Sequence, residues 1–309
     1  MKQRGHERRE HVGRWASPES EARFRSLEDE LWDEAADLRP AAHDVPTAYG
    51  TTRAYRWGGD GEPVLFLHGA TGTSLSWVPY IAPLGGRTAY AVDTIGDVGR
   101  SRQTTPIRDP ADLVVWLDET LAGLDLEGVH VAGTSYGGFL GLLLAVHRPE
   151  RVRSLTLFDP GGIERLRLLR FLAWGTACLV ASRLPDRPRR AAGRVLRMPA
   201  LDDPRLLAWV LYGQRHHRVR LLPPEPLADD DLRSIAAPVL LLAGEKSEVH
   251  DTRALVARAE ALLPDVDAEL VPGAGHALML SHLARCTERL VDFVGEVEAG
   301  GRRPKRITP

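Results

Sequence analysis

The strongest constraint on the fold is a Gly-Thr-Ser-Tyr-Gly sequence, residues 133–137, that joins two apolar runs. The run before it, 129–132, predicts a buried strand, and the longer run after it, 139–146, predicts a helix. A serine at a sharp strand-to-helix turn needs glycines two residues before and after it, because they leave room for the crowded backbone. The pattern therefore predicts that Ser135 exposes its hydroxyl at the edge of a sheet. The alternative is an ordinary serine at a helix N-cap.

Strands and helices are expected to alternate along most of the chain. Buried apolar runs predict strands over 63–67, 88–92, 129–132, 152–158, 238–243 and 268–271. Helices are expected over 17–38, 76–84, 111–124, 252–263 and 283–297, and the helix after Ser135 ends at Pro149. A first strand pair is expected over 44–57, with its turn at 58–61. The alternation predicts an α/β fold: a mostly parallel twisted sheet with helices on both faces, whose ligands bind at the carboxyl ends of strands.

Between 161 and 230 the alternation lapses into helical, arginine-rich sequence punctuated by proline. This stretch is too long for a plain loop, so we expect a helical cap there. The α/β core then comprises 41–160 and 231–299, preceded by a helical leader over 1–40 and followed by a disordered basic tail over 300–309. The cap is basic, and we expect a solvated face with binding of an anionic group as the open alternative. The arginines that make it basic include Arg165, Arg167, Arg170, Arg187, Arg189, Arg190, Arg194 and Arg197.

Composition excludes several classes of protein. A net charge of −2 over 309 residues gives no bulk reason to expect a nucleic-acid or membrane partner. The apolar segments are far shorter than the roughly 20 residues that a membrane helix requires. Only two cysteines are present, and the sequence begins with polar residues rather than an apolar leader. We therefore expect a cytoplasmic protein with reduced thiols.

A general base and an oxyanion hole are expected near Ser135. His276 lies in a glycine-rich loop directly after the last predicted strand, where the backbone turns freely and the imidazole can face the sheet edge. The sequence from His68 to Gly72 also follows a strand, and such a loop supplies one backbone N–H to developing negative charge. We assign the two amides of the oxyanion hole to Ala70 and Tyr136.

Three carboxylates compete to orient His276. Asp159 ends the strand after the helix that Ser135 begins, and this spacing favours it. Glu248 and Asp251 follow the 238–243 strand, but Asp251 also suits the N-cap of the next helix. Asp159 is our first choice, with Glu248 and Asp251 as alternatives.

The chain resembles the α/β hydrolase superfamily over nearly its whole length, through His68-Gly69, 133–138, Gly244-Glu245 and 273–276. Within it, the chain is most similar to bacterial carboxylesterases of the naproxen esterase type, through 92–97 and 230–234.

That closer resemblance implies that a glutamate at the position of Ser247 completes the triad in those esterases, whereas their residue matching Asp159 is not acidic. This sequence reverses both. Haloalkane dehalogenases resemble it in carrying an acid at the strand end that matches Asp159, although their nucleophile is an aspartate.

These observations predict a serine hydrolase that cleaves a small, largely apolar carboxylic ester through a Ser135–His276–Asp159 triad and an acyl-enzyme. No cofactor or metal is expected, and the partner is a small-molecule ester. Other chemistry on the same site is the alternative: hydrolysis of a C–C bond or a lactone, or acyl transfer. A non-catalytic protein that senses a ligand is a further alternative.

Overall fold

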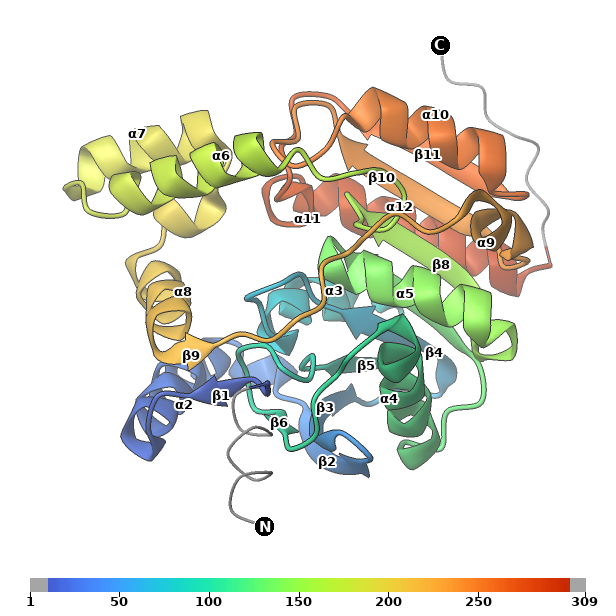
Figure 1. Ribbon diagram of the computed structural model, residues 1–309, viewed down its shortest axis with the longest axis horizontal. Coiled ribbons are helices and arrows are strands. Elements are labelled where there is room, and N and C mark those ends of the chain that lie inside the picture. The colour runs from blue at the N-terminus through green and yellow to red at the C-terminus, as the bar shows by residue number, and fades with distance from the viewer. Residues whose placement is uncertain (1–10, 301–309) are drawn as a thin grey trace.

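Residues 11–300 are described by a computed structural model, with a twisted sheet at its centre (Figure 1). The sheet has nine strands in the order β11-β10-β8-β7-β4-β5-β3-β2, with β6 paired to β3. The strands are β2 (Ala41–Thr47), β3 (Gly50–Trp57), β4 (Gly61–Leu67), β5 (Arg87–Val92), β6 (Arg102–Gln103), β7 (Val129–Thr134), β8 (Val152–Phe158), β10 (Val239–Gly244) and β11 (Val266–Val271). From β11 to β5 the strands are parallel, whereas β3 is antiparallel to both of its long neighbours.

Alternate residues of the central strands enter two hydrophobic cores, because successive side chains of a strand point to opposite faces. In β4, Leu65 and Leu67 belong to one core, and Val64 and Phe66 belong to the other. The first core is covered by α4 (Pro110–Gly123), α5 (Tyr136–His147) and α10 (Thr252–Leu262). The second is covered by α3 (Val78–Ile81), α11 (Leu278–Ser281) and α12 (Leu283–Glu298). The predicted α/β fold, with a mostly parallel sheet between two helical layers, is confirmed.

Short elements connect these layers. They are η1 (Ala36–Leu38), η2 (Ser74–Trp77), η3 (Ala82–Leu84), η4 (Pro149–Arg151) and α9 (Asp229–Ser234).

The segment 161–230 follows β8, ends within α9 and forms its own group of helices. It contains α6 (Leu168–Ala181), α7 (Asp186–Leu196), η5 (Pro199–Leu201), α8 (Pro204–His216) and β9 (His217–Arg218). Helices α6 and α7 lie side by side and extend away from the sheet (Figure 1).

Helix α2 (Pro18–Glu34) bridges this segment and the sheet. The ring centroids of Phe24 in α2 and Trp209 in α8 are 5.6 Å apart. Those of Trp32 in α2 and Tyr55 in β3 are 5.2 Å apart. Next to α2, β1 (Arg14–Trp15) pairs antiparallel with β9. Nothing in the sequence distinguishes the two-residue strands of that pair.

One expected turn is misplaced. The β2–β3 hairpin turns at Ala48 and Tyr49, whereas 58–60 leads from β3 into β4. The glycines at 58–61 gave a strong turn signal, and the two-residue turn that the chain uses has no Asn-Gly or Gly-Gly pair.

The predicted boundaries of leader, core and cap stay predictions. Residues 1–10 of the expected leader and 301–309 of the expected tail lie outside the described residues. Within 11–300, no helix has both the length and the apolar character needed to cross a membrane.

Candidate active site

Ser135 stands at the turn between β7 and α5 on a strained backbone. Its φ of 50° and ψ of −111° lie in a region that residues with side chains rarely adopt. The turn needs its glycines: a Cβ at Gly133 would lie 2.4 Å from the oxygen of Gly137, and a Cβ at Gly137 would lie 2.0 Å from the oxygen of Leu67. The Ser135 side chain does not cap α5. The alternative of an ordinary N-cap serine is therefore not what the structure has.

His276 is the hydrogen-bond partner of Ser135. It lies in the loop after β11, and its Nε2 is 3.0 Å from Ser135 Oγ. The loop depends on glycine twice. Gly273 has a φ of 72°, and a Cβ at Gly275 would come 2.9 Å from Glu248 Oε2. The glycines thus let the loop bring the imidazole to the sheet edge that carries Ser135.

Asp159 completes the hydrogen-bonded chain. It follows β8 directly, it is fully buried, and its Oδ2 is 2.5 Å from His276 Nδ1. A carboxylate only accepts, so Nδ1 carries the proton and Nε2 is free to accept from the Ser135 hydroxyl. Asp159 has a φ of 45°, the second strained position in the chain of three. Of the three carboxylates weighed from the sequence, it is the one that the structure brings to the imidazole ring.

Further donors surround the Asp159 carboxylate. The Ser247 hydroxyl donates to Oδ2 at 2.6 Å, and the Gly244 N–H donates to Oδ1 at 3.2 Å. The Val249 N–H donates to Ser247 Oγ at 3.2 Å, which leaves the Ser247 proton directed at Asp159. These hydrogen bonds offset the cost of burying a charge. The position at which naproxen-type esterases are expected to carry their acid thus holds a hydroxyl donor to Asp159.

Glu248 and Asp251 have other partners. Glu248 Oε2 accepts from the backbone N–H of His276 at 3.1 Å, and its Oε1 accepts from Arg197 at 3.2 Å. Asp251 caps α10, as expected, and pairs with Arg167. Within the described residues, neither carboxylate forms a hydrogen bond with the His276 ring.

Ala70 and Tyr136 approach Ser135 from two different elements. Tyr136 is the first residue of α5, where a backbone N–H has no partner within the helix. Ala70 lies in the loop after β4, and a Cβ on its neighbour Gly69 would stand 3.4 Å from Ser135 Cβ. This placement beside Ser135 suits both amides for binding an oxyanion.

Two buried side chains anchor the Ala70 loop. His68 Nε2 accepts from the Thr94 N–H at 2.9 Å, so its Nδ1 carries the proton and donates to the Gly69 oxygen at 2.8 Å. Burial lowers the pKa of His68, which keeps the ring neutral. Asp97 Oδ2 accepts from the Thr71 N–H at 2.8 Å. His68 therefore orients the loop.

His250 is the residue near the site that sequence reasoning missed. It follows β10, is 2% exposed, and its ring centroid is 6.1 Å from that of His276. Burial lowers the pKa of His250 to about 4, so the ring is neutral at pH 7 and does not repel positive charge on His276. Nothing in the sequence set it apart from the other histidines.

Asp159, His250 and His276 together also offer three potential metal ligands. However, the 2.5 Å between Asp159 Oδ2 and His276 Nδ1 is shorter than the separation of about 3.4 Å between two ligands of a tetrahedral zinc ion. That distance suits a hydrogen bond.

Comparison with known proteins agrees with the fold. The model of the alpha/beta hydrolase family matches residues 64–289, from β4 to α12. The chain belongs to this family.

Several relatives are carboxylesterases. Carboxylesterase YbfK of Bacillus subtilis is 27% identical over 288 residues, which cover 91% of this chain and 96% of the relative. The crystal structure of naproxen esterase from Bacillus subtilis matches with a TM-score of 0.73 and 27% identity, over 86% of this chain and 96% of that one. The expected similarity to the naproxen esterase type is confirmed, and the protein is an esterase-like hydrolase.

A third relative has a different printed activity. The 2-hydroxymuconate semialdehyde hydrolase of Pseudomonas putida is 25% identical over 261 residues, which cover 78% of this chain and 90% of that protein.

Proposed function

We propose that this protein is a serine esterase that cleaves a small, largely apolar carboxylic ester through an acyl-enzyme, without a cofactor. The observation that carries the proposal is the hydrogen-bonded chain from Ser135 Oγ through both nitrogens of His276 to Asp159 Oδ2, with distances of 3.0 and 2.5 Å. The similarity to carboxylesterases over most of the chain supports the ester as substrate.

In the acylation step, Ser135 Oγ attacks the ester carbonyl carbon while His276 Nε2 takes the serine proton. Asp159 holds the Nδ1–H and stabilises the imidazolium. The N–H groups of Ala70 and Tyr136 donate to the carbonyl oxygen as it becomes negative. His276 then gives its proton to the alcohol oxygen, the alcohol leaves, and the acyl group stays on Ser135.

Deacylation repeats these roles with water. His276 Nε2 removes a proton from a water molecule, which attacks the acyl carbon. When the tetrahedral intermediate collapses, His276 returns the proton to Ser135 Oγ and the carboxylic acid is released. Ser135, His276 and Asp159 thereby return to their starting protonation states.

A C–C bond hydrolase is the second candidate, because 2-hydroxymuconate semialdehyde hydrolase is similar over most of this chain. It would use the same Ser135 and His276. Aryl and alkyl esters, lactones and a vinylogous 1,5-diketone, tested side by side, separate esterase, lactonase and C–C hydrolase activity. Transfer of the acyl group to an added alcohol identifies an acyltransferase.

Covalent labelling tests for a functional nucleophile. A fluorophosphonate should modify Ser135, located by peptide mass spectrometry, and Ser135→Ala should lose both the label and p-nitrophenyl butyrate turnover. Loss of a triad nucleophile lowers kcat by about 10⁶-fold. The control Ser234→Ala removes an exposed hydroxyl from α9 and should keep both. A protein that takes no label would be a ligand sensor rather than an esterase, and Ser135→Ala with a tenth of wild-type turnover would exclude Ser135 as nucleophile.

We also propose that the segment 161–230 acts as a cap on this site. The contact of Arg197 with Glu248, beside the His276 loop, supports this role. Location in the cytoplasm stays a prediction from the sequence.

A further inference from the structure

Exposed apolar side chains are concentrated on one hairpin of helices. Among the described residues, nine large hydrophobic side chains are exposed, and eight of them lie on α6, on α7 or in the turn between them. The ninth is Val115 in α4. The eight are Leu168, Leu169, Phe171, Leu172, Leu179, Val180, Leu184 and Val195. Isolated exposed hydrophobic residues are ordinary, but a contiguous set marks a surface that binds something.

The exposed surface of α6 carries a single charge, in the first turn of the helix. The less exposed residues of this helix are Trp174, Ala177, Cys178 and Ala181. The opposite side holds Leu169 and Val180, which are 85% and 59% exposed. Arg170 is the one charged residue of α6. A surface helix of a soluble domain normally turns polar residues to water. The apolar outer face of α6 departs from this pattern.

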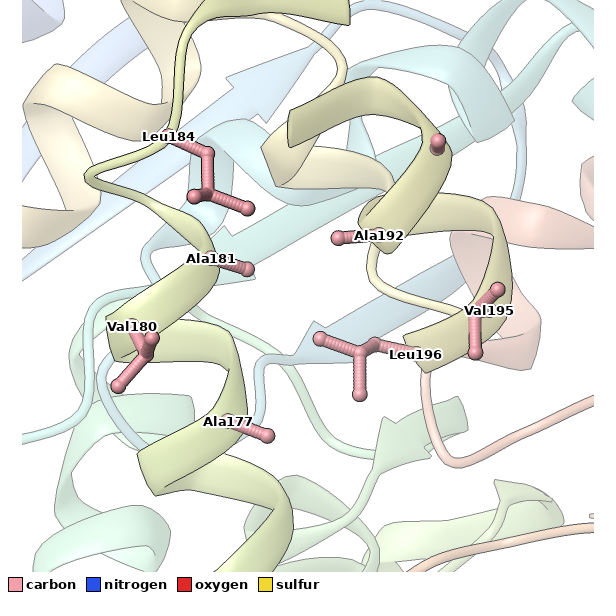
Figure 2. A pocket seen from close by; sticks show the side chains of 8 residues that line it. Ala177, Val180, Ala181, Leu184, Ala192, Val195 and Leu196 are labelled. Carbon is pink, nitrogen blue, oxygen red and sulfur yellow. The ribbon is translucent and has the colours of Figure 1, made fainter. Parts of the chain in front are cut away.

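The face continues across an open apolar groove between the two helices, with a volume of about 570 Å³ (Figure 2). Val180 and Ala177 line it from α6, and Val195 and Leu196 line it from α7. Val195 is 74% exposed. The apolar surface therefore extends over both helices, and α6 alone is about 21 Å long at 1.5 Å per residue.

The same hairpin is strongly basic. Residues 164–197 contain nine arginines and two acidic residues, whereas the whole chain has a net charge of −2. Three of the arginines form ion pairs within the described residues: Arg167, Arg189 and Arg197. The other six, all exposed, form none there: Arg165, Arg170, Arg183, Arg187, Arg190 and Arg194.

On α7 the arginines and the apolar residues lie in adjacent rows. Arg187, Arg190 and Arg194 follow one another at helical spacing, and Ala191 and Val195 form the next row. A helix with an apolar row beside an arginine row suits the boundary between lipid headgroups and acyl chains.

We propose that the α6–α7 hairpin docks on an anionic lipid surface, with the apolar groove at the acyl boundary and the arginines against the headgroups. The net charge of the whole chain gives no reason to expect a membrane partner, but the positive charge of this hairpin gives one. A second copy of the chain fits less well, because a two-fold contact would bring two like-charged hairpins together. The binding is peripheral, since no described helix is long and apolar enough to span.

Vesicle binding tests the proposal. The full-length protein is sedimented with vesicles of phosphatidylcholine alone and of phosphatidylcholine with an equal amount of phosphatidylglycerol. It should bind the anionic vesicles, and the binding should weaken as salt rises, because salt screens the headgroup charge. Equal binding to both vesicle types, or no binding to either, would overturn the proposal.

Two sets of variants separate the apolar from the charged contribution. The double variant Val180→Glu with Val195→Glu should weaken binding at least tenfold, whereas Val115→Glu, an equivalent change on α4, should not. Replacing Arg187, Arg190 and Arg194 with glutamine should weaken binding about a hundredfold, at ~1 kcal/mol for each arginine near the surface. Unchanged binding in both hairpin variants would exclude this hairpin as the contact.

Sedimentation velocity tests whether a second copy of the chain binds this surface instead of lipid. If the wild type forms a dimer that Val180→Glu with Val195→Glu dissolves, and no vesicle binds, the face is a contact between copies and the proposal is wrong. Lipid binding does not use the catalytic serine. Ser135→Ala should therefore bind anionic vesicles like the wild type, and failure of the esterase proposal would leave this one standing.

Discussion

Substitution of Asp159 by asparagine should lower kcat for ester hydrolysis by about three to four orders of magnitude. The side chains are nearly equal in size, so the effect comes from hydrogen bonding and charge. The Gly244 N–H donates to Oδ1 and the Ser247 hydroxyl donates to Oδ2, so an asparagine must lose one of these hydrogen bonds. When its oxygen faces Gly244, its NH₂ faces His276. Nδ1 would then accept and Nε2 would carry the proton.

That tautomer cannot take the proton of Ser135, whose Oγ lies 3.0 Å from Nε2. The neutral amide also fails to stabilise the imidazolium. The matched control is Glu248→Gln, which alters a carboxylate bound to the backbone N–H of His276 and not to its ring. We expect it to keep kcat within about tenfold of the wild type.

A second acid position gives a stricter test. Ser247 Oγ lies 2.6 Å from Asp159 Oδ2, so a glutamate at 247 reaches the same region. Ser247→Glu alone places two carboxylates together and should lower activity. Combined with Asp159→Asn, it should restore at least tenfold of the lost kcat, because one carboxylate again faces His276.

The assay is steady-state hydrolysis of p-nitrophenyl butyrate, with circular dichroism to verify folding. Folded Asp159→Asn within tenfold of the wild type would refute the assignment. If Glu248→Gln or Asp251→Asn instead caused the large loss of kcat, the acid of the triad would lie after β10.

Two further predictions concern the scaffold. Gly137→Ala should abolish soluble folded protein or lower Tm markedly, because its Cβ would meet the Leu67 oxygen at 2.0 Å; a Tm equal to that of the wild type would contradict this close approach. Burial lowers the pKa of His130 to about 4, aided by Arg153 and Arg87 against Glu298. The unfolded chain, with a histidine pKa of about 6.5, therefore binds more protons, and stability falls by about 2 kcal/mol between pH 7 and 5. His130→Gln should remove that part of the slope in urea unfolding, and an identical slope would exclude it.

The sequence predicts those parts of the site that depend on local backbone demands. The glycines around Ser135 and before His276 are required by the turns themselves, so their spacing is visible in the chain. Asp159 could be favoured because strand order places its end beside that of Ser135. Ser247 is different: its hydroxyl contacts Asp159 across 88 residues, and the sequence gives no sign of which side chain it meets.

The position of α2 was unpredictable for the same reason. Its amphipathic pattern indicates a helix, but the choice of α8 as partner depends on how Phe24 and Trp209 meet in space. Such contacts follow from the assembled fold and leave no periodic trace in the sequence.

The Glu248 carboxylate links the His276 loop to the α6–α7 hairpin. One oxygen holds the N–H of His276 and the other holds Arg197, directly after α7. The hairpin is therefore not an interchangeable module. A chimera that imports another protein's helices at 161–230 without an arginine at 197 would leave one oxygen of the buried Glu248 carboxylate unpaired beside His276. Exchange of this segment is thus coupled to residue 248, and engineers who replace it should change positions 197 and 248 together.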